Sequence, residues 1–281
     1  MPSQLLELYL PKAAEIQEVI EENSQIKTFV LAFVDPEYND GFSYEPGQFL
    51  MVSVPHCGEA PISISSTPVN RGTVHLSVRR AGKLTEAMHD MHKGDVLALR
   101  GPYGRPFPMA SLVGRDLLFV AGGIGLAPLR SVINTCLATG HERSITILYG
   151  SRTPSDIAFK ADLQAWGQRD NVSCQLTVDR AEPGWDGAVG LVTALLGHCT
   201  LAPHETKALL CGPPMMIRAV LGQLADRGFA DQDIITTMER HMKCAVGICR
   251  HCHMDDKLVC KDGPVFTLEE LKQLNVMELQ G

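Results

Sequence analysis

Between residues 116 and 238 the sequence alternates apolar runs with helix-like stretches. The apolar runs cover 116–121, 144–149, 172–178, 206–210 and 234–238, and the helix-like stretches cover 128–139, 156–166, 191–196 and 214–227. Strands that are apolar along their whole length are buried on both faces, and helices between them supply crossover connections. We therefore expect this half of the chain to form an α/β doubly wound parallel sheet.

The first hundred residues have a different pattern. Short β-branched or alternating runs at 26–34, 48–54, 73–79 and 95–100 are separated by Gly and Pro, and one helix-like stretch covers 84–91. Few strands with tight connections favour an antiparallel β-barrel over a sandwich, because closure removes exposed edges. The change of pattern places a boundary near residues 109–115. We expect three parts, at 1–110, 111–238 and 239–281, with a short helix over 267–274.

The third part contains four cysteines, Cys244, Cys249, Cys252 and Cys260, separated by four, two and seven residues. The first three positions reproduce the spacing of a plant-type [2Fe–2S] loop. A structural zinc site is the alternative, but zinc sites usually pair two C-x2-C units, and the outer spacings here differ. Nine cysteines, an odd number in a long chain, argue against a disulfide framework.

Composition excludes several classes of function. The net charge of −7 argues against nucleic acid or an anionic membrane as a partner. The most apolar run, 117–129, is too short to span a bilayer, so no membrane insertion is expected. The first residues lack the pattern of a signal peptide. With this many unpaired thiols, a reducing cytoplasmic location is expected.

A glycine-rich turn, 121–128, follows the first apolar run of the second part and opens a helix. Glycines such as Gly123 and Gly125 let backbone N–H groups approach a pyrophosphate, and a helix N-terminus favours anions. The turn departs from the dinucleotide fingerprint because Pro128 stands where a third Gly or Ala belongs. A merely tight strand–helix turn is the alternative interpretation.

Two further motifs end strands of this sheet. Ser151 and Arg152 follow the second strand, where a site selective for NAD would place an acid, and they offer donors to a 2′-phosphate instead. A solvated loop charge is the alternative for Arg152. Cys211 ends the fourth strand, at the sheet edge where ligands bind; a small buried thiol is the alternative.

In the barrel, 60–66 reads as a proline-kinked strand rich in hydroxyls. The segment 79–85 leads into the helix-like stretch, where N–H groups, Thr85 and cations are suited to hold phosphates. Without other evidence both segments would be ordinary strand and turn.

In this order, the motifs resemble the ferredoxin–NADP⁺ reductase superfamily over nearly the whole chain. With the cysteine loop added, the chain looks most similar to the gamma (diaphorase) subunits of cytoplasmic NAD(P)-linked sulfhydrogenase-type [NiFe] hydrogenases. It also resembles electron-transfer subunits of dihydroorotate dehydrogenase and the corresponding subunit of anaerobic sulfite reductase. The resemblance rests on the segments 58–65, 121–128, 149–154, 177–180, 211–213, 239–244 and 259–266.

The resemblance implies an FAD-binding barrel (1–110), an NAD(P)-binding domain (111–238) and a [2Fe–2S] segment (239–281). FAD would be bound by Pro61, Ile62, Ser63, Ser65, Leu76, Ser77, Val78, Gly82, Leu84 and Thr85. NAD(P)H would be bound by Gly123, Ile124, Gly125, Ser151, Arg152, Gly212 and Pro213, with Cys211 as the catalytic residue. The four cysteines named above would ligate the cluster.

The function implied is that of an electron-transfer subunit in a larger oxidoreductase complex with hydrogenase, sulfite reductase or similar iron–sulfur subunits. The flavin would convert hydride pairs into single electrons for the cluster. A free-standing NAD(P)H reductase of a small acceptor or soluble carrier is one alternative. A non-enzymatic module with a zinc clip is another.

Two departures from the superfamily pattern stand out. Ala60 occupies the position where an Arg usually binds flavin phosphate, and Arg79, Arg80 and Lys83 are candidates to replace it. In the cysteine loop, Ala245 and Arg250 stand where relatives often have Gly. Near a cluster, the charge of Arg250 would favour the reduced state. For His251 and His253 a solvated loop position is preferred over a ligand role.

Overall fold

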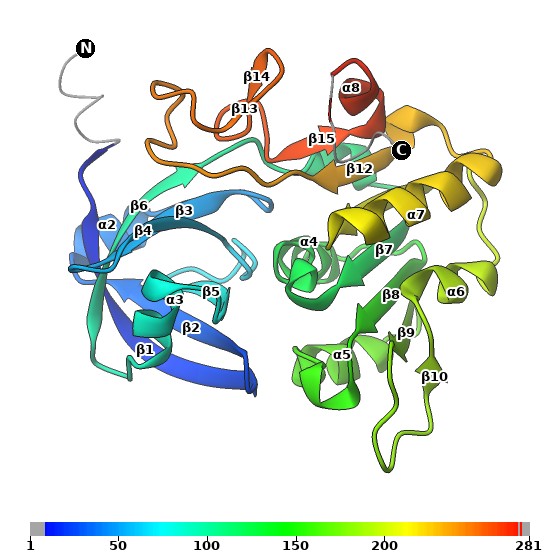
Figure 1. Ribbon diagram of the computed structural model, residues 1–281, viewed down its shortest axis with the longest axis horizontal. Helices are drawn as coiled ribbons and strands as arrows, with labels where there is room; N and C mark the ends of the chain where they lie inside the picture. The colour runs from blue at the N-terminus through cyan, green and yellow to red at the C-terminus, as the bar shows by residue number, and fades with distance from the viewer. Residues whose placement is uncertain (1–8, 275, 277–281) are drawn as a thin grey trace.

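The computed structural model describes residues 9–274 and 276. The outer ends of the expected first and third parts lie outside the described residues. Two bodies lie side by side, and the C-terminal segment runs along one edge of both, at the top of Figure 1. No helix within the described residues is long and apolar enough to cross a membrane.

The first body is an antiparallel barrel of six strands in the order β4-β3-β6-β1-β2-β5. A bridge between Ile64 and Leu76 joins the two ends of this order, so the sheet closes. Its elements are β1 (Lys12–Asn23), β2 (Ile26–Phe33), α2 (Pro36–Gly41), β3 (Phe49–Val54), β4 (Gly58–Ser63), β5 (Val74–Arg79), α3 (Lys83–His89) and β6 (Val96–Tyr103). The expected barrel is confirmed.

Strand β1 was not expected from the sequence. It carries several glutamates, and only Ala14 and Ile16 are buried. It nevertheless pairs along its length with β2 and over four residues with β6. Its place is therefore fixed by strand pairing rather than by an apolar pattern of its own.

The second body is a sheet in the order β10-β9-β8-β7-β11-β12-β15, parallel except where β15 joins β12. Its strands are β7 (Asp116–Gly122), β8 (Ile145–Ser151), β9 (Val172–Val178), β10 (Ala188–Val189), β11 (Thr206–Cys211), β12 (Ile234–Thr237) and β15 (Val265–Thr267). Its α-helices are α4 (Leu126–Ala138), α5 (Lys160–Gly167), α6 (Val192–Gly197) and α7 (Pro214–Asp226). Short 3-10 turns cover Met109–Leu112, Gly123–Gly125, Pro154–Asp156 and Asp231–Asp233.

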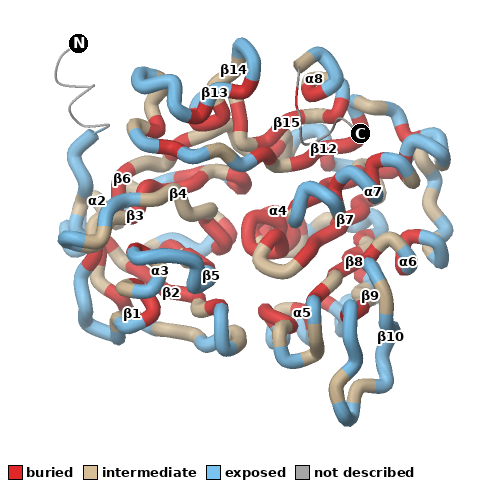
Figure 2. Tube along the Cα trace, viewed as in Figure 1, coloured by how far each residue is buried: buried red, intermediate tan, exposed pale blue. Residues whose placement is uncertain are grey.

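Alternate residues of the strands build two cores. On one face Leu117, Phe119 and Ala121 of β7 pack with α4 and α5. On the other face Leu118 and Val120 pack with α6 and α7. Helices thus cover both faces of the sheet, and the buried strands run through its centre (Figure 2). The doubly wound prediction is confirmed.

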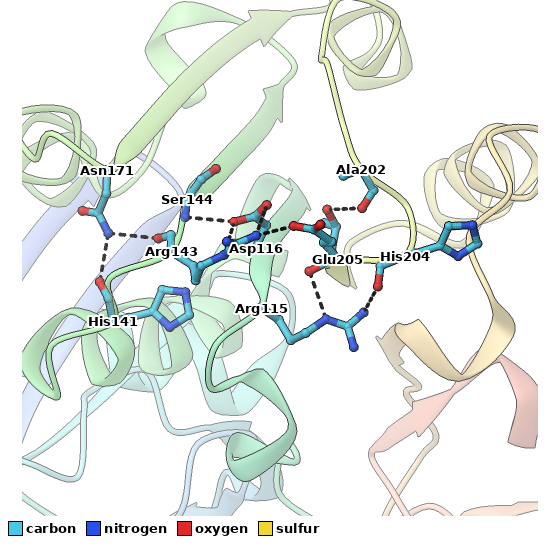
Figure 3. Close-up of polar contacts among 10 residues, drawn as sticks. Arg115, Asp116, His141, Arg143, Ser144, Asn171, Ala202, His204 and Glu205 are labelled. Atoms are coloured by element: carbon cyan, nitrogen blue, oxygen red, sulfur yellow. Dashed lines mark hydrogen bonds and ion pairs between the residues drawn. The ribbon is translucent and has the colours of Figure 1, made fainter.

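Charged side chains hold the amino ends of the central strands (Figure 3). Arg143 donates to both carboxylate oxygens of Asp116, at 3.0 and 3.1 Å, and pairs with Glu205. Arg115 donates to the backbone carbonyls of His204 and Glu205. Ion pairs and hydrogen bonds thus connect the strands at this end of the sheet. The expected ligand motifs lie at the opposite end.

The third part contains a small hairpin, β13 (His253–Met254) and β14 (Lys257–Leu258), and ends in α8 (Leu268–Lys272). Thr267 and Glu270 form a capping box that starts α8. Between the hairpin and the helix, β15 returns to the α/β sheet, which the sequence analysis did not anticipate. A three-residue strand carries too little pattern to be predicted. The segment is anchored to the α/β sheet through β15 and to the barrel through a shared apolar core.

Candidate functional site

The glycine-rich turn and the Cys211 motif meet at the carboxyl ends of β7 and β11. These strands are neighbours, with Ala121 opposite Cys211. The chain winds outward in one direction from β7 through β8 and β9, and in the other through β11 and β12. This is the topological switch point, where open α/β sheets bind ligands.

Glycine is required at this meeting point because the two loops touch through their backbones. A Cβ atom on Gly125 would clash with the carbonyl oxygen of Cys211. A Cβ on Gly212 would lie 3.0 Å from the backbone nitrogen of Gly122. The two motifs therefore pack directly against each other, and Gly123, Ile124 and Gly212 remain half-buried at this edge, where a phosphate or a planar ring can approach.

Cys211 itself is buried, and the Thr237 hydroxyl donates to its sulfur at 3.0 Å. Burial raises the pKa of the Cys211 thiol to about 12, although the hydrogen bond from Thr237 opposes the shift. The thiol is therefore neutral at physiological pH. This state suits a small side chain that lines a ligand, and it does not suit a nucleophile.

At the end of β8, Ser151 is buried and Arg152 is exposed. The backbone N–H of Arg180 donates to the carbonyl of Arg152 at 3.0 Å, so a second arginine follows the same edge. Asp156 accepts a hydrogen bond from the Thr153 hydroxyl at 3.0 Å. The acid nearest Arg152 in sequence thus already accepts one hydrogen bond, and the backbone of Arg180 lies beside that of Arg152.

In the barrel, Pro61, Ile62 and Ser63 lie half-buried on β4. Leu76 and Val78 point into the barrel core, so only their backbone faces outward. The Ser77 hydroxyl lies 2.8 Å from those of both Ser65 and Thr28, and all three residues are buried. Among Leu76, Ser77 and Val78, the three residues of β5 expected to line FAD, Ser77 is the one with a polar side chain.

The turn 79–85 is ordered by Thr85, whose hydroxyl accepts from the backbone N–H groups of Ala81 and Gly82. Lys83 donates to the carbonyl of His56, and Arg80 lies 3.9 Å from Asp90. Arg79 is exposed, and its guanidinium has no hydrogen bond or ion pair within the described residues. Among the three cations proposed to replace the missing Arg, Arg79 is the one left available.

The four cysteines of the third part form two pairs, each joined by a hydrogen bond from a backbone N–H to a sulfur. The backbone N–H of Cys249 donates to the sulfur of Cys244 at 3.3 Å, and that of Cys260 to the sulfur of Cys252 at 3.5 Å. Cys252 and Cys260 are buried, and Cys249 is exposed. Within the described residues no three ligand-type side chains converge on one ion position. The backbone N–H groups that point at two of the four sulfurs fit thiolate ligation of an iron–sulfur cluster.

Residues of positive φ curl this loop around the Cys244 sulfur. Ala245, Gly247 and Arg250 have φ of 62°, 81° and 56°. Burial raises the pKa of Cys244, but N–H groups of Cys249, Val246 and Ile248 outweigh it and lower the pKa to about 6. Thiolate ligation is favoured by such donors. His251 and His253 are exposed.

Comparison with protein-family models divides the chain into three stretches. An oxidoreductase FAD-binding domain matches residues 13–107, and an oxidoreductase NAD-binding domain matches 119–221. The iron–sulfur cluster binding domain of dihydroorotate dehydrogenase B matches 239–272.

Relatives match along almost their full length. Sulfhydrogenase 2 subunit gamma of Pyrococcus furiosus is 39% identical over 270 residues, covering 90% of this chain and 93% of that protein. An electron transfer subunit of dihydroorotate dehydrogenase B from Methanothermobacter thermautotrophicus is 36% identical, covering 94% and 92%. The solved NADH-dependent reduced ferredoxin-NADP oxidoreductase matches with a TM-score of 0.75 at 21% identity, covering 94% of this chain and 90% of that one. This last match shows the fold.

The chain therefore belongs to the family of NAD(P)H-dependent oxidoreductases, with FAD-binding, NAD-binding and iron–sulfur domains, that includes sulfhydrogenase gamma subunits and dihydroorotate dehydrogenase B electron-transfer subunits.

Proposed function

We propose that this protein is the electron-transfer subunit of a larger oxidoreductase complex with hydrogenase, sulfite reductase or similar iron–sulfur subunits. Electrons would pass between NAD(P)H and the partner through FAD and one [2Fe–2S] cluster. When bound, FAD supplies the conversion between hydride pairs and single electrons. The observation that carries the proposal is a core shared by Phe49, Met51 and Tyr103 of the barrel with Cys252 and Cys260.

The nucleotide side of the site uses the carboxyl edge of the α/β sheet. Gly123, Ile124 and Gly125, with Cys211, Gly212 and Pro213, would bind the nicotinamide end through backbone groups. Ser151 and Arg152 would bind the 2′-phosphate of NADPH, with Arg180 nearby. The hydrogen bond between Thr153 and Asp156 supports this choice, because it reduces the capacity of that carboxylate to accept a ribose hydroxyl.

The flavin side uses the outer face of the barrel. Pro61, Ile62, Ser63 and Ser65 would contact the ring system, together with the backbone of Leu76 and Val78 and the Ser77 hydroxyl. Gly82, Leu84 and Thr85 would lie at the phosphates, and Arg79 would supply the charge that Ala60 lacks. We assign 1–110 to flavin binding and 111–238 to nucleotide binding.

The cluster side, 239–281, would hold iron through Cys244, Cys249, Cys252 and Cys260. Cys249 and its neighbour Ile248 are exposed, with Ile248 63% accessible. An exposed ligand beside an exposed apolar side chain suits the exit of electrons to a partner. All nine cysteines are free of disulfides, which favours a reducing cytoplasm as the location.

Cofactor analysis and kinetics test this function directly. The anaerobically purified protein is expected to release FAD on heating and to contain about two irons per chain. NADPH should bleach the flavin absorption, and large iron–sulfur subunits should co-purify. About one zinc with no iron would refute the cluster, and the release of FMN would refute the flavin assignment.

A further inference from the structure

A buried arginine of the barrel, Arg100 on β6, reaches the cysteine loop. Its side chain is 6% exposed. The guanidinium donates to the backbone carbonyls of Lys243 and Cys244 at 3.0 and 2.8 Å. These carbonyls belong to the first of the four cysteines and to the residue before it.

The same guanidinium binds a carboxylate of the flavin-side strand. Arg100 donates through Nε and Nη2 to the two oxygens of Glu59, at 2.7 and 2.5 Å. Glu59 lies on β4, two residues before Pro61. A further bond reaches the Tyr103 hydroxyl at 3.3 Å. All five N–H donors of the guanidinium are therefore used.

Two tyrosine rings cover the cation. The Cζ atom of Arg100 lies 5.6 Å from the ring centre of Tyr9 and 5.5 Å from that of Tyr103. Burial alone would lower the pKa of Arg100, but hydrogen bonds to Glu59 and Tyr103 raise it above its ordinary value, so the group stays charged. A charge shielded from water acts more strongly on its surroundings than an exposed one.

We propose that Arg100 is a positioning residue that fixes Cys244 against the flavin-side strand and whose charge, balanced by Glu59, sets the reduction potential of the cluster. The inference rests on the proposed cluster site. Reduction adds negative charge to the cluster, so a nearby cation raises the potential and a nearby carboxylate lowers it. The ion pair of Arg100 and Glu59 connects the strand that carries Pro61 with the backbone at Cys244.

The two members of the pair predict shifts of opposite sign. In the full chain loaded with FAD and cluster, Arg100→Gln removes the cation and should lower the midpoint potential. Glu59→Gln removes the anion while leaving a side chain that still accepts a hydrogen bond, and should raise it. Each shift should change the one-electron equilibrium about tenfold, which corresponds to about 59 mV. Arg100→Lys keeps the charge and should stay closer to wild type than Arg100→Gln.

A redox titration followed by electron paramagnetic resonance measures these potentials. The control is Arg143→Gln, the same change of charge at the amino ends of the strands (Figure 3), which should leave the potential unchanged. A merely structural contact would move both variants in one direction or neither, and either result overturns the inference. If Arg100→Gln fails to hold a cluster, Glu59→Gln alone decides by the sign of its shift. A wild-type protein without iron would instead refute the proposed function.

Discussion

The barrel has two interfaces of different chemical character. Towards the α/β domain it adds Ile26 to the apolar core and is joined by hydrogen bonds: Asn23 donates to the carbonyl of Asp156, Ser131 donates to that of Ser66, and the hydroxyls of Thr67 and Thr135 lie 2.9 Å apart. Towards the cysteine segment it shares an apolar core, in which Phe49 and Met51 pack with the buried cysteines. Arg100 adds hydrogen bonds from its charged guanidinium to the carbonyls of Lys243 and Cys244.

The difference matches what each contact has to do. Interfaces between domains of one chain usually permit small relative movements, so we expect this interface to adjust as nucleotide enters and leaves. An apolar core loses free energy with every contact broken, so it keeps its geometry. The cysteine segment is thus held in place against the barrel at the second interface.

The largest expected effect comes from removing an electron carrier at the fixed interface. Cys249→Ser takes away the exposed thiol, so iron content should fall and electron transfer to the partner should be lost. Reduction of the flavin by NADPH should persist because the nucleotide side is untouched. Visible spectra, iron analysis and stopped-flow flavin bleaching measure the three quantities.

The matched control is Cys174→Ser, a half-buried thiol on β9 that should keep its full iron content. Wild-type iron and unimpaired transfer in Cys249→Ser would contradict the assignment of this cysteine as a ligand.

The interface with the α/β domain should weaken in acid through His75. Burial and, to a smaller extent, the charge of Arg130 lower the pKa of His75 from 6.5 to about 4, and Asp162 opposes them. The imidazole is therefore neutral in the folded protein, whereas the unfolded chain binds a proton as the pH falls through 6.5. Stability is complete above that pH and is lost as the pH falls towards 4, by up to about 3 kcal/mol.

Urea unfolding of wild type and His75→Asn at pH 7.5, 5.5 and 4.5 would measure this effect. Asparagine does not titrate, so the variant should lose this part of the pH dependence. Parallel pH profiles for the two proteins would show that His75 contributes nothing to it.

A smaller effect is expected where the nucleotide meets the α/β domain. Arg152→Ala should raise the Michaelis constant for NADPH about tenfold, since a charge-assisted bond to the 2′-phosphate contributes about 1.5 kcal/mol. The constant for NADH should barely change because NADH has no such phosphate. Steady-state kinetics with both nucleotides measure this difference.

Arg71→Ala, which removes an exposed arginine of the barrel, serves as the control. A wild type that strongly prefers NADH, or an equal loss with both nucleotides, would refute this role of Arg152.

Local sequence patterns predicted the nucleotide-side motifs and the cysteine spacing, but they did not predict how the barrel contacts the cysteine segment. The turn at Gly123, the end of β11 at Cys211 and the cysteine spacing are each contained in a few consecutive residues, and the parallel sheet brings the first two together. The bond from Arg100 to Cys244 joins residues 144 positions apart, and the Glu59 pair lies on another strand. Nothing near Arg100 in the sequence signals either partner.

The departure from glycine at Ala245 and Arg250 shows a similar limit. The resemblance implied Gly at both positions, and the structure gives a physical reason, because both residues have positive φ. The pattern could not show that the loop keeps this conformation with larger side chains.

The smallest effect concerns the backbone of the cysteine loop. Arg250 is exposed with a φ of 56°, a conformation that costs a non-glycine residue about 1–2 kcal/mol. Arg250→Gly removes this strain but adds freedom to the unfolded chain, worth about 0.5–1 kcal/mol. The net result should be a gain of about 0.5–1 kcal/mol in the free energy of unfolding. His251→Gly, at the exposed neighbouring residue without positive φ, should instead lose stability, since it only adds freedom to the unfolded chain. Urea unfolding of the two variants measures both changes in the free energy of unfolding. If both variants lost the same amount of stability, the backbone at Arg250 would carry no strain.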